Sequence, residues 1–414
     1  MTRTHTPQQP LRPMRLPAER TPPVPAAHHP ETRAIHVEIP DLDGARPLNV
    51  PLYQTANFAY DHTEDLAQAI NRPESFAYLR NSNPTVRALE NAVTSLEGGA
   101  AALATASGMG AIHTVLHTLL SSGDHVIAQK HLYGGTFALL KDLAARFGIE
   151  TTYIDAQDPA EVAAALRPTT KVLYLETLSN PTAQVTDLPA FFAAGKEAGL
   201  TSIVDNTFAS PVGCQPIAMG GDVVVHSSTK FLSGHCDVLG GIAVFADADL
   251  HRSVWSRSLE TGPIADPFAA WLTLRGLGTL GLRMQRHHDN ADALARFLSR
   301  HPGVDKVHWP GLEDHPGHAL ARRLLPNGYG GVFAIDVAGG RQETLEFTGR
   351  LRLADRAVSL GGYKTLVQQP SATSHRSMDA EGLRAIGITE GTVRIAVGLE
   401  HIDDLCADFA QALG

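Results

Sequence analysis

The sequence predicts an α/β fold, with a mostly parallel sheet in a large domain and a smaller α+β domain at the C-terminus. Two observations predict it. Between residues 85 and 265, short apolar runs alternate with helix-like segments, as in βα units, whose strands pair in parallel. From about residue 266 the pattern changes to a long helical stretch followed by further strand-like runs. The chain of 414 residues is long enough for both domains, at about 100–200 residues each.

In the large domain, the first helix is expected over residues 85–96, where apolar side chains recur every three or four positions before Gly98. A second helix is expected to open at residues 107–110. Strands are expected where short apolar runs follow turn residues. These runs cover residues 125–128, 172–175, 202–205 and 223–225.

In the smaller domain, a helix is expected to begin at Pro267, and helical spacing continues to Arg300. Residues 330–336 and 392–398 are strand-like. We therefore expect a C-terminal domain over residues 266–414, after a large domain over residues 85–265.

The N-terminal segments differ from both domains. Residues 1–45 are rich in proline and arginine, so they cannot bury enough apolar surface to offset the entropy of folding. We expect a disordered tail there. Residues 46–84 are expected to form an N-terminal arm.

Composition excludes several classes of function. A net charge of −9 and the lack of a basic stripe with interleaved aromatic residues argue against nucleic-acid binding. No apolar run approaches the roughly 18 residues that span a membrane. Cys214, Cys236 and Cys406 are widely spaced, which argues against disulfides and a zinc–thiolate site and favours the cytoplasm. His113 and His117 lack the glutamate of an H-E-x-x-H pattern, so we expect no metal site.

Lys230 is the main candidate for chemistry. It follows a short apolar run and the hydroxyl residues Ser227, Ser228 and Thr229. A lysine at the end of a buried strand is costly as a cation, so burial lowers its pKa and frees the amine as a nucleophile. Such an amine can form a Schiff base, and nearby hydroxyls can hold a phosphate. These features suggest pyridoxal 5'-phosphate (PLP), whose aldehyde binds lysine.

Two further side chains fit this cofactor. Asp205 ends a strand-like run, so we expect it at the same edge of the sheet as Lys230. Its carboxylate could hold a pyridinium nitrogen protonated, or it could cap a helix or turn. Tyr133 lies in a loop after another such run. It could stack on the ring and assist proton transfer, or be an ordinary loop tyrosine.

Two other elements have an open interpretation. The small residues of Ser107–Gly110 at a helix start could let backbone N–H groups approach an anion, or could simply cap the helix. Arg394, in an apolar strand, needs a carboxylate partner from a substrate or from the protein itself. We find neither the GxGxxG fingerprint of nicotinamide enzymes nor the GxSxG elbow of serine hydrolases.

Nine motifs occur in one fixed order along the chain from about Pro51 onward. Together they resemble the Cys/Met-metabolism family of PLP-dependent enzymes. That family includes methionine γ-lyase, cystathionine γ- and β-lyases, cystathionine γ-synthase and O-acylhomoserine sulfhydrylase. The motifs are Tyr78–Thr85, Ala106–Gly110, Leu132–Gly134, Glu176–Pro181, Val204–Thr207, Ser227–Phe231, Trp271–Leu277, Ser359–Gly362 and Val393–Glu400.

The resemblance implies the type I fold of PLP enzymes and a role for individual residues at the cofactor. Lys230 would hold the aldehyde and then carry protons, Asp205 would pair with the ring nitrogen, and Tyr133 would stack on the ring. Asn180 would lie near the phenolic oxygen. The phosphate would be bound by Ser107, Gly108, Met109, Ser227 and Thr229.

The resemblance also implies how substrate and subunits are arranged. Arg394 and Ser359 would hold the substrate carboxylate. Tyr78 and Arg80 would reach the phosphate of a neighbouring subunit, with Tyr78 taking part in catalysis there. The active unit would then be a dimer, usually within a tetramer.

Three positions depart from the family pattern and bear on the reaction. Lys364 stands where cystathionine enzymes typically carry a glutamate, so we count it as a substrate-contacting residue that disfavours cystathionine. Gly135 stands where many methionine γ-lyases have cysteine, and Cys236 where a small residue or histidine is usual. We predict γ-elimination from a γ-substituted L-amino acid. The alternatives are γ-replacement and, more remotely, a PLP-binding protein without turnover.

Overall fold

The computed structural model describes residues 28–37, 39, 47–376 and 378–414. Most of the predicted tail therefore lies outside the described residues. Within it, however, α1 (Pro30–Ile35) is a helix that buries Arg33 and Ala34. Arg33 donates a hydrogen bond to the Ser95 carbonyl, and α1 contacts α3 (Pro84–Glu97). The prediction of disorder is wrong for this segment, because Ala34 does find apolar surface to cover.

The larger sheet has seven strands in the order β1-β7-β6-β5-β4-β2-β3. All neighbours pair in parallel except β7, which is antiparallel to both β1 and β6. The predicted α/β class with a mostly parallel sheet is confirmed, and the four predicted runs form β2, β4, β5 and β6. The strands are β1 (Ala101–Thr105), β2 (His125–Gln129), β3 (Glu150–Ile154), β4 (Thr170–Glu176), β5 (Thr201–Asp205), β6 (Val223–His226) and β7 (Gly241–Phe245).

Apolar side chains on both faces of this sheet are buried, as expected for parallel strands between helix layers. Alternate residues of one strand enter different cores: Val204 packs with α3 and α7, whereas Ile203 packs with α4, α5 and α9. These helices are α4 (Gly108–Leu119), α5 (Gly134–Phe147), α7 (Leu188–Glu197) and α9 (Ala248–Thr261), with the shorter α6 (Ala160–Ala165), α8 (Ser210–Gly213) and 3-10 helix η1 (Pro216–Met219) beside them.

The helix starts follow capping rules that are readable in the sequence. Asn83 accepts hydrogen bonds from two N–H groups of the first turn of α3, and Ser107 accepts one from Gly110 at the start of α4. Gly98 ends α3 with a positive φ of 75°, which glycine adopts without strain. The helical stretch predicted from Pro267 onward is two helices, α10 (Pro267–Leu277) and α11 (Leu280–Leu298), separated at Gly278.

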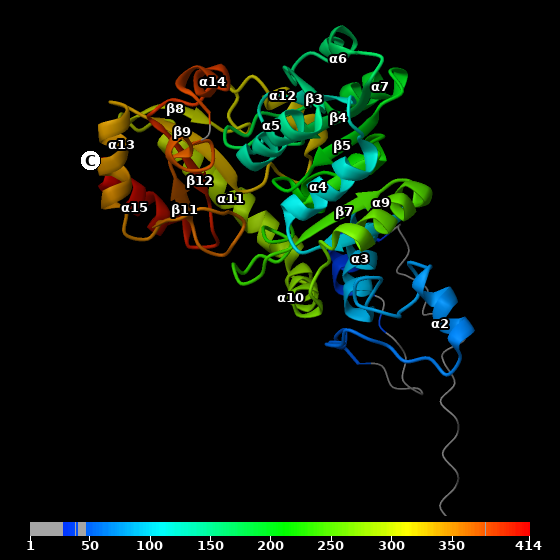
Figure 1. Ribbon diagram of the computed structural model, residues 1–414. Coiled ribbons are helices and arrows are strands. Elements are labelled where there is room, and N and C mark those ends of the chain that lie inside the picture. The colour runs from blue at the N-terminus through cyan, green and yellow to red at the C-terminus, as the bar shows by residue number, and fades with distance from the viewer. Residues whose placement is uncertain (1–27, 38, 40–46, 377) are drawn as a thin grey trace, which may run out of the picture.

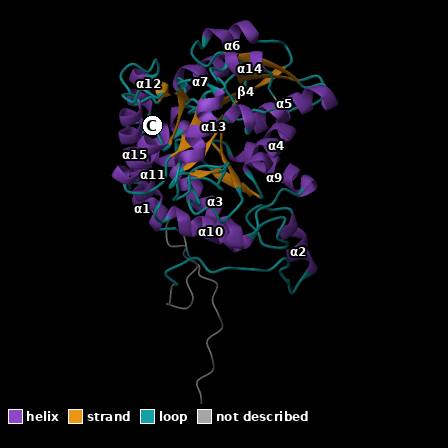
Figure 2. Cartoon of the chain, turned by 90° about the vertical axis from the view of Figure 1, so that its left-hand side faces the viewer, coloured by secondary structure: helices purple, strands orange, loops and turns teal. Residues whose placement is uncertain are grey.

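The smaller sheet has five strands in the order β10-β11-β12-β9-β8. Helices α11, α13 and α15 supply the apolar residues packed against it, and the views in Figures 1 and 2 place these helices together beside the strands. Its elements are β8 (Val304–His308), α12 (His318–Leu324), β9 (Val332–Val337), α13 (Arg341–Arg350), β10 (Asp355–Arg356), β11 (Leu366–Gln368), 3-10 helix η2 (Pro370–Ala372), α14 (Ala380–Ala385), β12 (Thr392–Ala396) and α15 (Ile402–Leu413).

The N-terminal arm lies beside the helices that cover the larger sheet, far from the smaller sheet in Figure 1. It contains α2 (Thr63–Ile70) and a bridge between Asn57 and Tyr78. The indole of Trp255 in α9 donates a 2.8 Å hydrogen bond to the Asn81 carbonyl and so fastens the arm. Among the described residues, no helix combines the length and apolarity needed to cross a membrane.

Candidate active site

A cavity of about 750 Å³ opens at the carboxyl ends of β4, β5 and β6. This is the edge where parallel sheets bind ligands. The segment around Ser359, the residues after β11 and Arg394 of β12 complete its wall, so both sheets contribute. Eleven residues predicted for the site line it: Ser107, Gly108, Met109, Tyr133, Asn180, Asp205, Ser227, Thr229, Lys230, Ser359 and Arg394.

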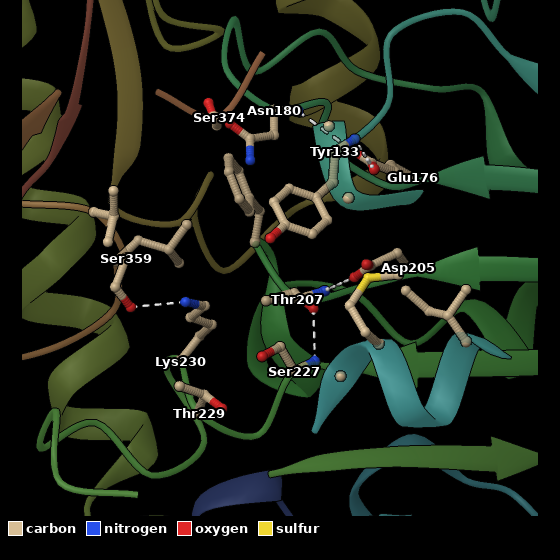
Figure 3. Close-up of a pocket in the computed structure, with 18 of the residues that line it drawn as sticks. Tyr133, Glu176, Asn180, Asp205, Thr207, Ser227, Thr229, Lys230, Ser359 and Ser374 are labelled. Carbon is tan, nitrogen blue, oxygen red and sulfur yellow. Dashed lines mark hydrogen bonds between the residues drawn. The ribbon is translucent and has the colours of Figure 1, made fainter. Parts of the chain in front are cut away.

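Lys230 lines this cavity from the turn after β6, and its amine points toward Ser359 (Figure 3). Its Nζ donates a 2.7 Å hydrogen bond to Oγ of Ser359. Burial, helped by the nearby Arg394 cation, lowers the pKa of the Lys230 amine to about 8. A substantial fraction of the amine is therefore neutral near pH 8, which is what a lysine nucleophile needs.

Asp205 ends β5 on the other side of the cavity from Ser359 (Figure 3). Burial raises the pKa of its carboxyl, while hydrogen bonds from Thr207 and the proximity of His226 lower it. The Thr207 N–H lies 2.9 Å from Asp205 Oδ1, and the Thr207 hydroxyl accepts a 2.9 Å bond from the Ser227 N–H. Thr207 thus links the carboxylate to the turn that carries Lys230. A cationic ring N–H at Asp205 would favour its ionised form.

The first turn of α4 faces the hydroxyl residues after β6. The first N–H groups of a helix have no carbonyl partner within the helix, and in α4 these N–H groups belong to Gly108 and Met109. A Cβ on Gly108 would lie 2.8 Å from Cβ of Ser227, so only glycine allows the two segments to approach this closely. The Thr229 hydroxyl is already paired with the backbone of Gly240, donating at 3.1 Å and accepting at 2.9 Å.

Tyr133 and Asn180 are held by one buried carboxylate that the sequence-based site prediction missed. Glu176 Oε1 accepts a 2.6 Å hydrogen bond from the Tyr133 N–H, and Oε2 accepts a 3.2 Å bond from the Asn180 N–H. Burial and the neighbouring Asp205 raise the pKa of Glu176. The signal for this residue was its place at the end of a predicted strand. Figure 3 shows the Tyr133 ring and the Asn180 amide side by side above Lys230.

Arg394 lies on the wall formed by the smaller sheet and is 4% exposed. Its guanidinium donates to Asn180 Oδ1 at 3.3 Å and to the Ser359 carbonyl at 2.5 Å. Its Nε is buried without a hydrogen-bond partner. Burial lowers the pKa of Arg394 to about 10, so the group remains a cation at neutral pH. This cation, with an N–H to spare, suits an entering carboxylate.

Three predicted site residues do not line this cavity. Tyr78 and Arg80 lie in the arm, where the Arg80 guanidinium sits 5.3 Å from the centre of the half-exposed Tyr78 ring. Lys364 lies in the bend before β11 and pairs with Asp355 at 3.4 Å. The roles given to these residues therefore remain predictions.

Among the described residues, no group of three or more His, Cys, Asp or Glu side chains could hold a metal ion.

The donor set fits PLP. One end of the cavity offers the Asp205 carboxylate for a ring nitrogen, and the other offers the α4 N-terminus and Ser227 for a phosphate. Lys230 approaches from a third side, next to Ser359, and the Tyr133 ring provides an aromatic face. The tight approach of Gly108 to Ser227 shapes the phosphate end.

The comparisons with known proteins agree with this geometry. The L-methionine γ-lyase of Fusobacterium nucleatum subsp. polymorphum is 41% identical over 387 residues, which cover 92% of this chain and 97% of the relative. A cystathionine γ-synthase structure from Xanthomonas oryzae pv. oryzae aligns with a TM-score of 0.88 at 37% identity, covering 93% of this chain and 98% of that one.

A third comparison concerns the lysine. A structure described as an O-acetylhomoserine (thiol)-lyase of Campylobacter jejuni aligns with a TM-score of 0.89 at 32% identity, covering 93% of this chain and 100% of that one. That structure contains an N'-pyridoxyl-lysine-5'-monophosphate residue. The sequence profile of the Cys/Met metabolism PLP-dependent enzymes matches residues 31–414. The chain therefore belongs to the Cys/Met metabolism family of PLP-dependent enzymes.

Proposed function

We propose that this enzyme catalyses γ-elimination from an L-amino acid with a leaving group on Cγ. The substrate R–X–CH2–CH2–CH(NH3⁺)–COO⁻ and water give R–XH, 2-oxobutanoate and ammonium. The observation that carries the proposal is the convergence of Lys230, Arg394 and Asp205 on one cavity. The methionine γ-lyase name of a relative that shares 41% of aligned residues supports the choice of γ-elimination.

Arg394 holds the substrate in this proposal. Its buried guanidinium and unpartnered Nε would bind the α-carboxylate, and the Ser359 carbonyl and Asn180 side chain keep the guanidinium in place. The α-carbon is then positioned near Lys230. A pure cofactor store would have no use for such a carboxylate site, which argues against a PLP-binding protein without turnover.

Lys230 carries the protons. Bound PLP supplies an electron sink for the pair released when the Cα–H bond breaks. Lys230 Nζ takes that proton as a neutral amine, which its lowered pKa permits, and can return it elsewhere on the carbon chain. Asp205 would hold the ring nitrogen, and Tyr133, fixed by Glu176, would cover the ring face and offer a phenol for proton transfer.

A second candidate is γ-replacement, in which an incoming nucleophile takes the place of the leaving group. The names of two structural neighbours, a cystathionine γ-synthase and an O-acetylhomoserine (thiol)-lyase, favour it. The cavity residues serve both reactions. We keep the proposal that Lys364 disfavours cystathionine as a substrate. Gly135, which stands where many methionine γ-lyases have cysteine, lies in the cavity wall.

The proposal extends to assembly and location. Tyr78 and Arg80 lie outside the cavity of their own chain, and the half-exposed Tyr78 ring is free to reach a neighbouring site. We infer a dimer with shared sites, within a tetramer. Cys214, Cys236 and Cys406 are free thiols, which suits the cytoplasm.

Two experiments test the function. The purified enzyme is expected to be yellow and to lose that absorbance in Lys230→Ala; a wild type that stays colourless after reconstitution with PLP contradicts the proposal. The enzyme is then given methionine, cystathionine and O-acetyl-L-homoserine, each with and without sulfide. Keto acid formed without sulfide identifies γ-elimination, and product formed only with sulfide identifies γ-replacement.

A further inference from the structure

Arg376 is a second guanidinium on the cavity wall, and the site described so far makes no use of it. It belongs to the segment after β11, which also contributes Thr373 and Ser374 to the lining, and Gln368 at the end of β11 lines the cavity beside them. All four side chains are polar. Leu239, Val358 and Leu360 are apolar parts of the same lining, and its other polar groups belong to the site already described. One stretch of the wall is therefore polar and cationic.

Buried contacts hold this stretch in place. His375 is fully buried, and its Nε2 lies 3.2 Å from the Leu132 carbonyl oxygen. The Ser374 carbonyl lies so close to Gly134 that a Cβ there would sit 1.9 Å from the oxygen. Figure 3 places Ser374 beside Asn180, near Tyr133. Arg376 follows directly after the buried histidine, so its backbone is anchored at the cavity.

The charge of Arg376 lacks a counterion within the described part of the chain. Its Nη1 donates a 3.0 Å hydrogen bond to the Thr373 carbonyl, which orients the group without neutralising it. No carboxylate oxygen of the described residues lies within 4.0 Å of an Arg376 guanidinium nitrogen, the distance that defines an ion pair. The cavity acids are engaged elsewhere: Glu176 holds Tyr133 and Asn180, and Asp205 is bonded to Thr207.

The other anions of the reaction already have sites. Arg394, deep in the wall, serves the α-carboxylate, and the α4 N-terminus with Ser227 serves the phosphate. We infer that Arg376 forms a subsite for a further anionic group, a carboxylate carried beyond Cγ of the substrate or on the incoming nucleophile. This inference rests on the proposed function and narrows its substrate class to acidic γ-substituents or acidic nucleophiles.

The test compares two esters that share every reacting atom. O-succinyl-L-homoserine carries a distal carboxylate, and O-acetyl-L-homoserine does not. In the PLP-loaded enzyme, Arg376→Gln is expected to lower kcat/KM for the succinyl ester about 10- to 100-fold, the value of a charge-assisted hydrogen bond, and to leave the acetyl ester within about twofold. Arg384→Gln, an exposed arginine in α14 outside the cavity, is the matched control and changes neither.

A second arm identifies the source of the anion. With O-acetyl-L-homoserine as donor, mercaptoacetate and 2-mercaptoethanol are compared as nucleophiles. A selective loss for mercaptoacetate in Arg376→Gln assigns the subsite to the nucleophile, and a selective loss for the succinyl ester assigns it to the leaving group. Equal effects on charged and neutral partners in both arms overturn the inference.

Binding without turnover separates this inference from the proposed function. L-2-Aminopimelate and L-norleucine have no leaving group, and they differ in a distal carboxylate. Their binding is followed by the absorbance of the bound cofactor. Tighter binding of L-2-aminopimelate that disappears in Arg376→Gln supports the subsite even if no ester is turned over. Turnover of the acetyl ester with no such preference retains the function and removes the subsite.

Discussion

Nζ of Lys230 and Oγ of Ser359 are joined by a 2.7 Å hydrogen bond across 129 residues of sequence. Lys230 follows a strand of the larger sheet, and Ser359 precedes β11 of the smaller one. Ser359 also has a φ of 87°, in the left-handed region that favours glycine. The bond therefore ties the reactive amine to a strained residue on the opposite wall.

The first prediction concerns the pH at which Lys230 reacts. Because burial lowers its pKa to about 8 from the ordinary 10.5, the nucleophilic amine is present above about pH 8. The rate at which PLP-free enzyme takes up PLP should rise with pH and then level off, and the midpoint of this rise should lie near pH 8. In Ser359→Ala the ammonium loses an acceptor, so the midpoint should fall. Stopped-flow absorbance measures both, and a wild-type midpoint near 10.5 contradicts the assignment.

The second prediction concerns the fork of Arg394. Arg394→Lys keeps the charge but loses the planar donor pair, so kcat/KM for any accepted amino acid should fall about 10- to 100-fold. The cofactor absorbance in the absence of substrate should stay unchanged, because Arg394 is assigned to the substrate. Steady-state kinetics with a spectrum of the resting enzyme decide this, and unchanged kinetics argue against the carboxylate site.

The third prediction concerns a buried pair behind the site. His226 Nε2 lies 2.6 Å from Glu97 Oε1, which also accepts a 3.0 Å bond from Asn206. Both partners of the pair are almost fully buried. Removing Glu97 leaves the buried groups of His226 and Asn206 without this hydrogen-bond partner, so Glu97→Ala should lower the free energy of unfolding by about 1–3 kcal/mol.

Denaturant unfolding checks the loss against a matched exposed pair. Asp142 and Arg146 form an ion pair on the surface of α5, and Asp142→Ala should cost at most about 0.5 kcal/mol. Similar losses in the two variants would show that burial does not govern the Glu97 contact.

The fourth prediction concerns Gly134. A Cβ there would lie 1.9 Å from the Ser374 carbonyl oxygen, so Gly134→Ala must displace the segment around His375. We expect a loss of about 1–3 kcal/mol in the free energy of unfolding and a fall in kcat/KM. Gly278→Ala, whose Cβ would meet nothing closer than 3.6 Å, is the control and should leave both unchanged. A harmless Gly134→Ala would mean that the segment moves aside freely.

Local sequence signals were enough to place Asp205 and Lys230 at one edge, because parallel strand ends meet there. Capping residues and helical spacing likewise located α3 and α4 to within a residue or two. Strand β7 was not predicted, since nothing local indicates that a strand returns antiparallel between β1 and β6.

The contacts between the two sheets could not be predicted from local pattern. The approach of Ser359 and Arg394 to Lys230 depends on how the two sheets pack against each other. Glu176 was overlooked as a site residue for a similar reason, since its contacts are with backbone N–H groups of Tyr133 and Asn180, which no motif displays. The short helix α1 was missed for a different reason. The proline- and arginine-rich composition predicted disorder and gave no sign of its contact with α3.

The construction of the cavity from two sheets has an evolutionary consequence. Groups fitted to the cofactor come from the larger sheet, whereas Arg376 and Ser359 come from the other wall. Substitutions at Arg376 and its polar neighbours can therefore change which leaving group or nucleophile is accepted while the residues around Lys230 stay the same. The choice of substrate and the chemistry at the cofactor are thus encoded in different parts of one chain.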